Sequence, residues 1–199
     1  MEKVYLIVIL CMLYSNTEAN TYTLTSGKWS EIYDDSCVDE GVEVRITGTV
    51  ILDRPIMIEG TLTIEDKAML IGLERITITE NGRLCNEGVI MAERLSNKGT
   101  VQSKHAISFI DDVSNSGTID NGDLMIAGKS IDIGKQSNIT GPGSYITNDL
   151  KVEENDEAIK PNIRYAGRLT KTEDSDIADP SKWEDGDKAP TGSQTPPKL

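Results

Sequence analysis

Three short stretches of the chain share one pattern: residues 84–90 (LCNEGVI), 95–101 (LSNKGTV) and 113–119 (VSNSGTI). Each reads aliphatic, small, Asn, any residue, Gly, Thr or Val, aliphatic. Asn and Gly both tolerate left-handed backbone, and an Asn side chain can hydrogen-bond neighbouring backbone, so the pair permits a sharp corner between short strands. Repeats this short cannot each form a core, so they must stack on one another. The predicted corner residues are Asn86, Gly88, Asn97, Gly99, Asn115 and Gly117.

Upstream of these repeats, aliphatic residues and occasional glycines occupy alternate positions over residues 42–52 and 56–64. A period of two indicates strands with one buried side, and the many β-branched residues disfavour a helix. Residues 46–50 (ITGTV) and 58–62 (IEGTL) are degenerate copies of the repeat. The spacing is irregular, because the first two of the three close copies start nearer to each other than the second and third do.

The expected fold class is all-β, a single short right-handed parallel β-helix, or β-solenoid. We expect the solenoid over residues 41–149 in roughly five or six coils, after an N-terminal cap region over 20–40. Residues 150–199 form an acidic, proline-containing tail that is too poor in apolar residues to order itself. Only 5% of the residues are aromatic, which fits a thin interior filled by Ile, Val and Leu. The alternative is an antiparallel β-sandwich whose turns share the Asn-x-Gly pattern.

The N-terminus predicts export. An apolar run over residues 4–13 is too short to span a bilayer, which needs about 20 apolar residues, but it fits the hydrophobic region of a signal peptide. Residues 1–19 are therefore the expected signal peptide, with cleavage between Ala19 and Asn20; an uncleaved anchor is the alternative. The protein is expected to be secreted or cell-surface, with no membrane span in the mature chain.

Two cysteines remain after that cleavage, Cys37 and Cys85. In an oxidising compartment they are a disulfide candidate, and two buried free thiols are the alternative. A zinc site needs three or four Cys or His ligands, and the mature chain offers only these two and His105, so we expect no metal and no cofactor. The formal net charge of −13 excludes nucleic acid as a partner, because nothing would neutralise the phosphates.

Acidic residues within the repeat region suggest an enzymatic alternative, a polysaccharide lyase or hydrolase fragment that uses exposed carboxylates. Solvated side chains of an acidic protein are the favoured interpretation, so no catalytic residue is assigned, and His105 has no nucleophile to pair with. Aromatic rings that flank the repeats, at Trp29, Tyr33 and Tyr145, are expected to cap the ends of the solenoid rather than stack on sugars. The candidate carboxylates are Asp111, Asp112, Asp120 and Asp123, with Arg94, Lys98 and Lys104 upstream.

The repeat resembles that of the parallel β-helices in bacterial secreted surface proteins, such as filamentous haemagglutinin-type adhesins and autotransporter passenger domains. Residues 26–30 (SGKWS) are also similar to the start of solenoid regions in secreted proteins of Bacteroidetes. The similarity covers residues 22–147. It implies a non-enzymatic structural or adhesive binding module, with a polysaccharide, an extracellular matrix component or another surface protein as partner. A secreted, protein-binding β-sandwich is the further alternative. The sequence indicates neither the ligand nor the oligomeric state.

The signal peptide is directly testable. N-terminal sequencing of the exported protein should begin at Asn20, because Thr17 and Ala19 supply the small residues before the cleavage point. A protein that retains the apolar run at its N-terminus would instead support the uncleaved anchor.

Overall fold

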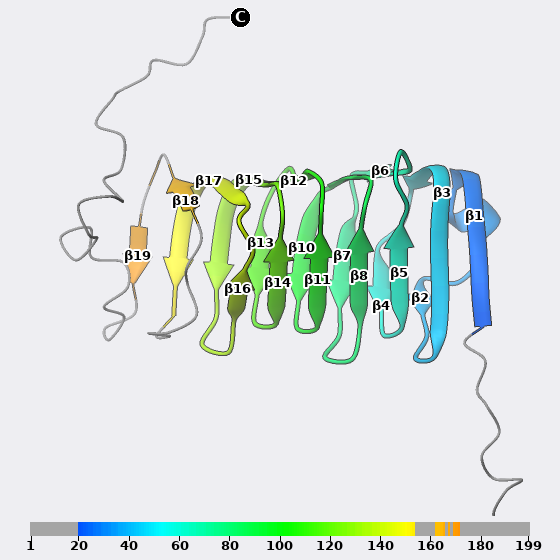
Figure 1. The fold of residues 1–199 in the computed structure, drawn as a ribbon, viewed down its shortest axis with the longest axis horizontal. Helices are drawn as coiled ribbons and strands as arrows, with labels where there is room; N and C mark the ends of the chain where they lie inside the picture. The colour runs from blue at the N-terminus through cyan, green and yellow to red at the C-terminus, as the bar shows by residue number, and fades with distance from the viewer. Residues whose placement is uncertain (1–19, 154–161, 166, 168, 172–199) are drawn as a thin grey trace, which may run out of the picture.

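The strand pairings decide the fold class. In the computed structural model, which describes residues 20–153, 162–165, 167 and 169–171, the chain winds into a β-solenoid of about seven turns (Figure 1). Every pairing between described strands is parallel. The expected parallel β-solenoid is confirmed, and the antiparallel sandwich is wrong.

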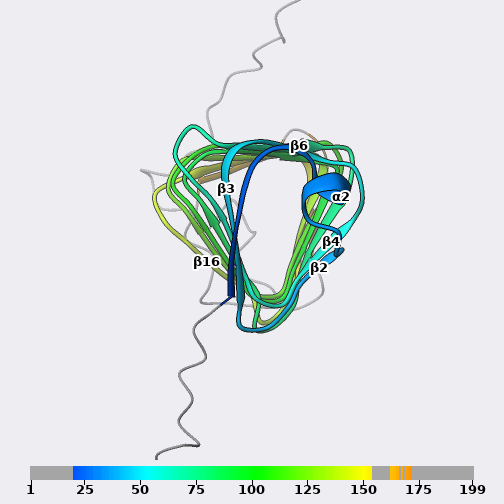
Figure 2. The same ribbon diagram turned by 90° about the vertical axis from the view of Figure 1, so that its right-hand side faces the viewer.

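The strands stack into three parallel sheets around a three-sided interior (Figure 2). Sheet 1 contains the first parts of β1 (Asn20–Lys28) and β3 (Val42–Leu52), then β5 (Thr61–Ile64), β8 (Arg83–Asn86), β11 (Thr100–Ser103), β14 (Thr118–Asn121) and β16 (Asn138–Thr140). Sheet 2 contains the second parts of β1 and β3, then β6 (Met69–Gly72), β9 (Val89–Ala92), β12 (Ile107–Phe109), the first parts of β15 (Leu124–Ile133) and β17 (Ser144–Val152), and β18 (Asn162–Tyr165).

Sheet 3 contains β2 (Cys37–Val38), β4 (Ile56–Ile58), β7 (Arg75–Ile78), β10 (Arg94–Asn97), β13 (Val113–Asn115), the second parts of β15 and β17, and β19 (Leu169–Lys171). A single helical turn, α2 (Trp29–Ile32), lies between β1 and β2. One circuit of the solenoid therefore runs through sheets 1, 2 and 3 and returns to sheet 1 one level along the axis.

This circuit explains the irregular repeat spacing. Asn97 in β10 pairs with Asn115 in β13, so the offset between the second and third repeats is one full turn. Asn86 belongs instead to β8 of sheet 1, where it stacks between Ile64 and Ser103. The shorter offset between the first and second repeats therefore separates different sides of the solenoid. The three repeats do not form one ladder, because the chain uses the same corner sequence at two of its three corners.

The repeat glycines are needed for a reason that differs from the expected one. Among the described residues, positive φ occurs at Lys67, Gly27, Gly41 and Gly141, and not at the glycines of the three repeats. A Cβ at Gly117 would instead overlap the carbonyl oxygen of Gly99 in the turn below, and a Cβ at Gly88 would overlap that of Ala68. Close approach of stacked backbones, rather than left-handed conformation, therefore requires glycine here.

The repeat asparagines point inward and bond along the stack. The Asn97 amide donates from Nδ2 to Oδ1 of Asn115 at 2.7 Å and to the backbone oxygen of Thr118 at 3.0 Å. The Asn86 Nδ2 donates to Oγ of Ser103 at 3.0 Å. All of these side chains except that of Thr118 are buried. Since a buried polar group is costly when unpaired, these donor hydrogen bonds stabilise and align the corners, although Oδ1 of Asn97 accepts none from the described residues.

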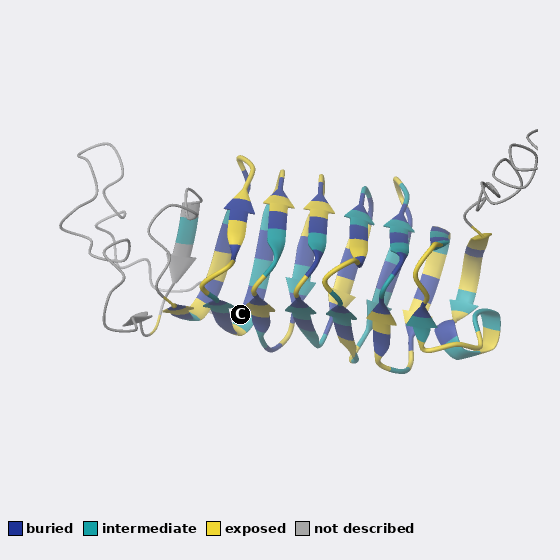
Figure 3. Cartoon of the chain, turned by 90° about the horizontal axis from the view of Figure 1, so that it is seen from below, coloured by how far each residue is buried: buried dark blue, intermediate teal, exposed yellow. Residues whose placement is uncertain are grey.

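Aliphatic ladders fill the rest of the interior, and buried and exposed residues alternate along the strands (Figure 3). In sheet 2, Val50, Leu70 and Ile90 stack in register, and Tyr145 continues the same inward position near the other end. Tyr145 is fully buried, so it is a core residue. Most of the other buried positions are held by Ile, Val and Leu. The low aromatic content of the chain therefore agrees with its narrow interior, as the sequence predicts.

The domain boundaries at both ends need correction. Residues 20–40 contribute β1 and β2, which pair with the next turn, so much of the predicted cap is itself the first turn of the solenoid. Trp29 of α2 is fully buried there, and its Nε1 donates to the backbone oxygen of Asp35 at 2.8 Å. Buried Leu150 and Val152 extend the solenoid beyond the expected end at residue 149, and β18 and β19 add pairings.

The predicted signal peptide, including Ala19, and most of the predicted tail lie outside the described residues, whereas Asn20 begins β1. In the described part of the chain, no helix is both long enough and apolar enough to cross a membrane.

The asparagine ladder should be a measurable source of stability. Asn97→Ala leaves the Asn115 and Thr118 oxygens without this donor, so we expect a loss of about 1–3 kcal/mol in the free energy of unfolding. Chemical denaturation measures it, with exposed Lys98→Ala as the control at the next residue. Equal effects of the two changes would contradict a structural role for the ladder.

Candidate functional site

The outer surface of sheet 2 differs in chemistry from the other two sheets. Its outward positions lie between the inward ones at Val50, Leu70, Ile90 and their equivalents. In the six turns from β3 to β17 these positions carry no charged side chain, although 27% of the whole chain is charged. At the two ends of the sheet, Lys28 of β1 and Arg164 of β18 occupy the register positions next to Ile51 and Ile146. We call this surface the aliphatic face; it consists of Thr49, Ile51, Met69, Ile71, Val89, Met91, Ser108, Leu124, Ile126, Ser144 and Ile146.

Register turns the aliphatic face into straight rows. Six of its residues form one continuous row, Ile51–Ile71–Met91–Ser108–Ile126–Ile146. A second row runs through Thr49, Met69 and Val89, and Leu124 and Ser144 occupy the same outward position further along. Because the strands are straight and in register, the rows make a flat surface of aliphatic ridges.

Several of these side chains are well exposed. The exposed fraction is 48% for Ile51, 42% for Met91 and 42% for Ile146. Two further apolar residues stand at the corners that follow sheet 2, Leu73 at 69% and Ile110 at 47%. Single exposed apolar residues are common on proteins, whereas contiguous apolar patches are typical of interaction surfaces.

The outer surfaces of sheets 1 and 3 are polar by comparison. Sheet 1 presents Thr, Arg, Glu, Gln, Asn and Asp at its outward positions apart from Cys85, and sheet 3 presents Arg, Thr, Ser, Asp and Lys apart from Met57 and Cys37. Arg45 illustrates how these charges are used: its Nη2 lies 2.6 Å from Glu65 Oε1 one turn along, and its Nη1 lies 3.2 Å from Glu43 Oε1. Such pairs connect successive turns along the solenoid.

Asp111, the first of the candidate catalytic carboxylates, belongs to a similar ion-pair group. Its Oδ2 lies 2.8 Å from Nη2 of Arg94 and its Oδ1 lies 2.7 Å from Nζ of Lys129, one turn to either side. Hydrogen bonds from Lys129 and Arg94 hold the pKa of Asp111 below its usual value. A carboxylate held ionised between two cations is suited to joining turns, not to donating a proton.

The structure does not bring the candidate carboxylates together. Asp112, beside Asp111 at the corner after sheet 2, accepts a hydrogen bond from Ser130 at 3.0 Å. Asp120 lies on sheet 1 and accepts one from Thr140 at 3.2 Å, whereas Asp123 lies at the corner between sheets 1 and 2. The basic candidates are also dispersed: Lys98 is exposed at the corner after sheet 3, and Lys104 pairs with Glu87 beside exposed His105.

The two cysteines of the disulfide candidate also lie apart. Both are free thiols, with Cys37 in β2 of sheet 3 and Cys85 in β8 of sheet 1. The structure thus has free thiols, as in the alternative, but each is only half-buried rather than buried. Burial raises the pKa of both thiols, which favours the protonated, unreactive form.

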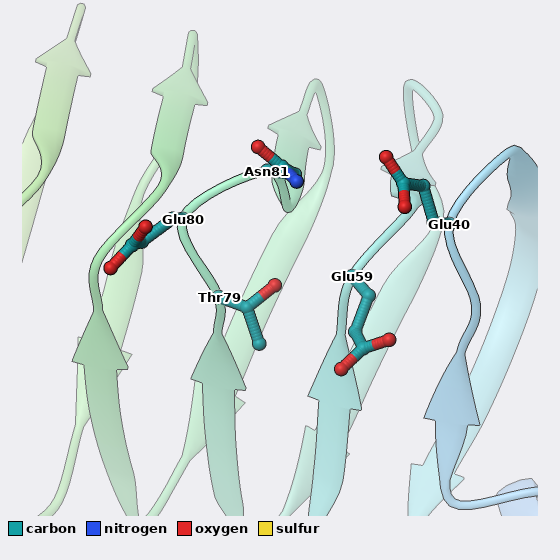
Figure 4. Close-up of a pocket in the computed structure, with 5 residues that line it drawn as sticks. All are labelled: Glu40, Glu59, Thr79, Glu80 and Asn81. Atoms are coloured by element: carbon teal, nitrogen blue, oxygen red, sulfur yellow. The ribbon is translucent and has the colours of Figure 1, made fainter.

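An acidic hollow lies at the corner between sheets 3 and 1 in the first turns (Figure 4). It measures about 300 Å³ and is lined by Glu40, Glu59, Thr79, Glu80 and Asn81. Beside it, the Cys37 thiol and the carboxylates of Asp39 and Glu59 place their ligand atoms within 4.8 Å of one another. The sequence did not indicate this grouping, because Cys37 and Glu59 meet only through the stacking of successive turns.

We assign no metal to this group of three side chains. Burial, together with a hydrogen bond to Asp39, raises the pKa of Cys37 to about 11. A bound cation would itself lower this pKa, so the shift describes the metal-free thiol. The group has three ligand side chains, none of them His, at a surface where acidic groups commonly lie together without an ion. The aliphatic face is consequently the candidate functional site that the structure supports best.

Accessibility of the aliphatic face can be measured by retention on a butyl-substituted matrix in ammonium sulfate, which strengthens apolar contacts. Met91→Glu should elute earlier than the unchanged protein, because it places a charge in the middle of the longer row. Gln102→Glu adds the same charge at an exposed position of sheet 1 and should elute nearly unchanged. Equal shifts for both variants would mean that retention depends on charge alone.

Comparisons with known proteins identify no relative of this chain. Neither a scan against protein-family models nor searches of curated proteins and of solved structures found a match. The resemblance to bacterial secreted β-helices therefore stays a prediction from the repeat residues. Inference about function rests on the geometry described above.

Proposed function

We propose that this protein is an exported, non-enzymatic structural and adhesive binding module, located outside the cell or on its surface. The observation that supports this most directly is the aliphatic face, a flat, uncharged surface on one side of a rigid solenoid. A row of exposed Ile and Met side chains costs solubility, and a protein that only needed to fold would carry polar residues there, as on sheets 1 and 3.

The chemistry of the aliphatic face favours a protein partner over a polysaccharide. Sugar-binding surfaces use aromatic rings that stack on the sugar, and polar groups that bond its hydroxyls. The aliphatic face offers neither rings nor charges, and its polar members are only Thr49, Ser108 and Ser144. Aliphatic ridges fit an apolar protein surface instead, by close packing and release of water.

The ion pairs weigh against the alternative of a polysaccharide lyase or hydrolase. Asp111 is held by Arg94 and Lys129, its neighbour Asp112 accepts a hydrogen bond from Ser130, and Asp120 and Asp123 lie on another part of the solenoid surface. A glycosidase needs two carboxylates that flank one bond, about 5–9.5 Å apart. The dispersed arrangement suits a scaffold whose charges join neighbouring turns.

The proposal is tested by measuring capture of the purified chain on immobilised extracellular-matrix proteins and on a polysaccharide array. We expect capture by protein that persists at high ionic strength, because apolar contacts are not screened by salt. Ile51→Glu combined with Met91→Glu should abolish it, whereas the matched pair Gln102→Glu and Thr140→Glu on sheet 1 should not.

Two results would count against this function. Capture that disappears with salt and is indifferent to the changes on the aliphatic face would mean that charged surfaces mediate binding. Turnover of an acidic polysaccharide that is lost in the Asp111→Asn, Asp112→Asn double variant would favour the enzyme instead.

A further inference from the structure

We propose that two copies of this chain pair through their aliphatic faces, as a face-to-face, two-fold dimer. This inference rests on the proposed binding role of that face and names its partner as a second copy. It is carried by three observations: continuous apolar runs in four strands of sheet 2, the regular rows on the outer side of that sheet, and the absence of charge along those rows.

Four of the six strands that carry the aliphatic face have the sequence pattern of strands covered on both sides, whereas β12 (ISF) and β17, which begins SYI, carry Ser at an outward position. Residues 50–52 (VIL), 69–71 (MLI), 89–91 (VIM) and 124–126 (LMI) are uninterrupted apolar triplets. Sheets exposed to water on one side alternate apolar and polar residues, whereas sheets covered on both sides have continuous apolar runs. Strands β5 and β11 of sheet 1 do alternate, as in TLTI and TVQS. The four apolar strands of sheet 2 therefore have the composition of strands with something packed on their outer side.

A second copy supplies a surface that matches the aliphatic face in shape. Each row repeats with the spacing of parallel strands, about 4.8 Å, so its ridges and grooves recur at that interval. A partner sheet with the same interval can interdigitate along the whole length, at the separation of about 10 Å that is usual for stacked sheets. In a two-fold arrangement the same patch serves both copies, and the rungs at the middle of the face meet each other.

Charge also permits this pairing. The whole chain has a formal net charge of −13, so most ways of bringing two copies together would place like charges against each other. The aliphatic face is the outer surface on which all six rungs lack charge, from Thr49 and Ile51 to Ser144 and Ile146. Face-to-face contact through it buries no charged side chain of its rows, which avoids the desolvation cost of ions.

The area of the aliphatic face determines how tightly two copies are expected to bind each other. Six rungs span roughly 29 Å and two rows roughly 14 Å, so each copy would bury about 400 Å² and the pair about 800 Å². A stable interface buries about 1,600 Å² in total, and contacts below about 1,200 Å² are weak or transient. We therefore expect a reversible dimer that forms at high concentration. Many copies displayed on one surface would raise the effective concentration and strengthen contact between surfaces.

Sedimentation velocity of the purified chain over a concentration series tests the proposal. The expected result is a shift from monomer toward dimer mass as concentration rises, unchanged or increased at high ionic strength. Ile51→Glu with Met91→Glu should keep the chain monomeric, because pairing would then bury unpaired carboxylates against the apolar rows of the other copy. The matched variant Gln102→Glu with Thr140→Glu should still dimerise, and circular dichroism spectra confirm that both variants are folded.

A crosslinking measurement gives the geometry independently. Ser108 lies in one of the two central rungs of the longer row, so a short bismaleimide should link Ser108→Cys of one copy to Ser108→Cys of the other, because it spans the distance between stacked sheets that a direct disulfide cannot bridge. Gln102→Cys, in the same turn but on sheet 1, should not be linked, and both variants carry the same two native thiols.

Three outcomes would overturn the pairing. The first is a monomer at every concentration, and the second is a dimer that the changes on the aliphatic face do not affect. The third is dimerisation that appears only after residues 172–199 are removed, since that segment would then be the natural occupant of the face. If the chain stays monomeric but its capture of matrix proteins depends on Ile51 and Met91, the pairing fails and the proposed function stands. Failure of both measurements would reject both proposals.

Discussion

Stacking of parallel strands in exact register is the constraint on which every other feature of this protein depends. Backbone hydrogen bonds hold each strand about 4.8 Å from its equivalent in the next turn. Any side chain therefore lies directly over the residue one turn earlier, whatever the number of residues in the loops between. Inward positions become ladders such as Val50–Leu70–Ile90, and glycine is required wherever two corner backbones approach, as at Gly99 and Gly117.

The same register also gives each side of the solenoid its own kind of surface, charged or apolar. On sheet 3 it brings opposite charges of neighbouring turns together, as in the Lys151–Asp132 pair, and the Arg94–Asp111–Lys129 group does the same at the corner between sheets 2 and 3, so that the charges reinforce the stack. On sheet 2 it gathers Ile51, Ile71 and Met91 into one row. A protein with a strongly negative formal charge thus has one neutral side, and that side is the one available for close apolar contact.

Much of the fold was predictable from local patterns. Period-two alternation over residues 42–64 indicated strands, and the three Asn-x-Gly copies indicated corners. The purpose of the glycines was not predictable, because a left-handed turn and a close backbone approach both select glycine. Nor were the ends: Leu150 and Val152 are buried because they pair with the preceding turn, which local composition does not reveal. The triplets at residues 50–52, 69–71 and 89–91 were the available sign of the aliphatic face.

The sequence by itself determined that this chain is all-β, that it bends at Asn and Gly, and that its interior is thin and aliphatic, because strand periodicity and corner chemistry are local properties. Tertiary structure alone decided which residues share a side of the solenoid. Successive turns differ in length because their loops differ. No fixed repeat period in the sequence therefore tells which residues lie on the same side of the solenoid. Only the hydrogen-bonded register between turns places Ile51 over Ile71 and separates Asp111 from Asp120.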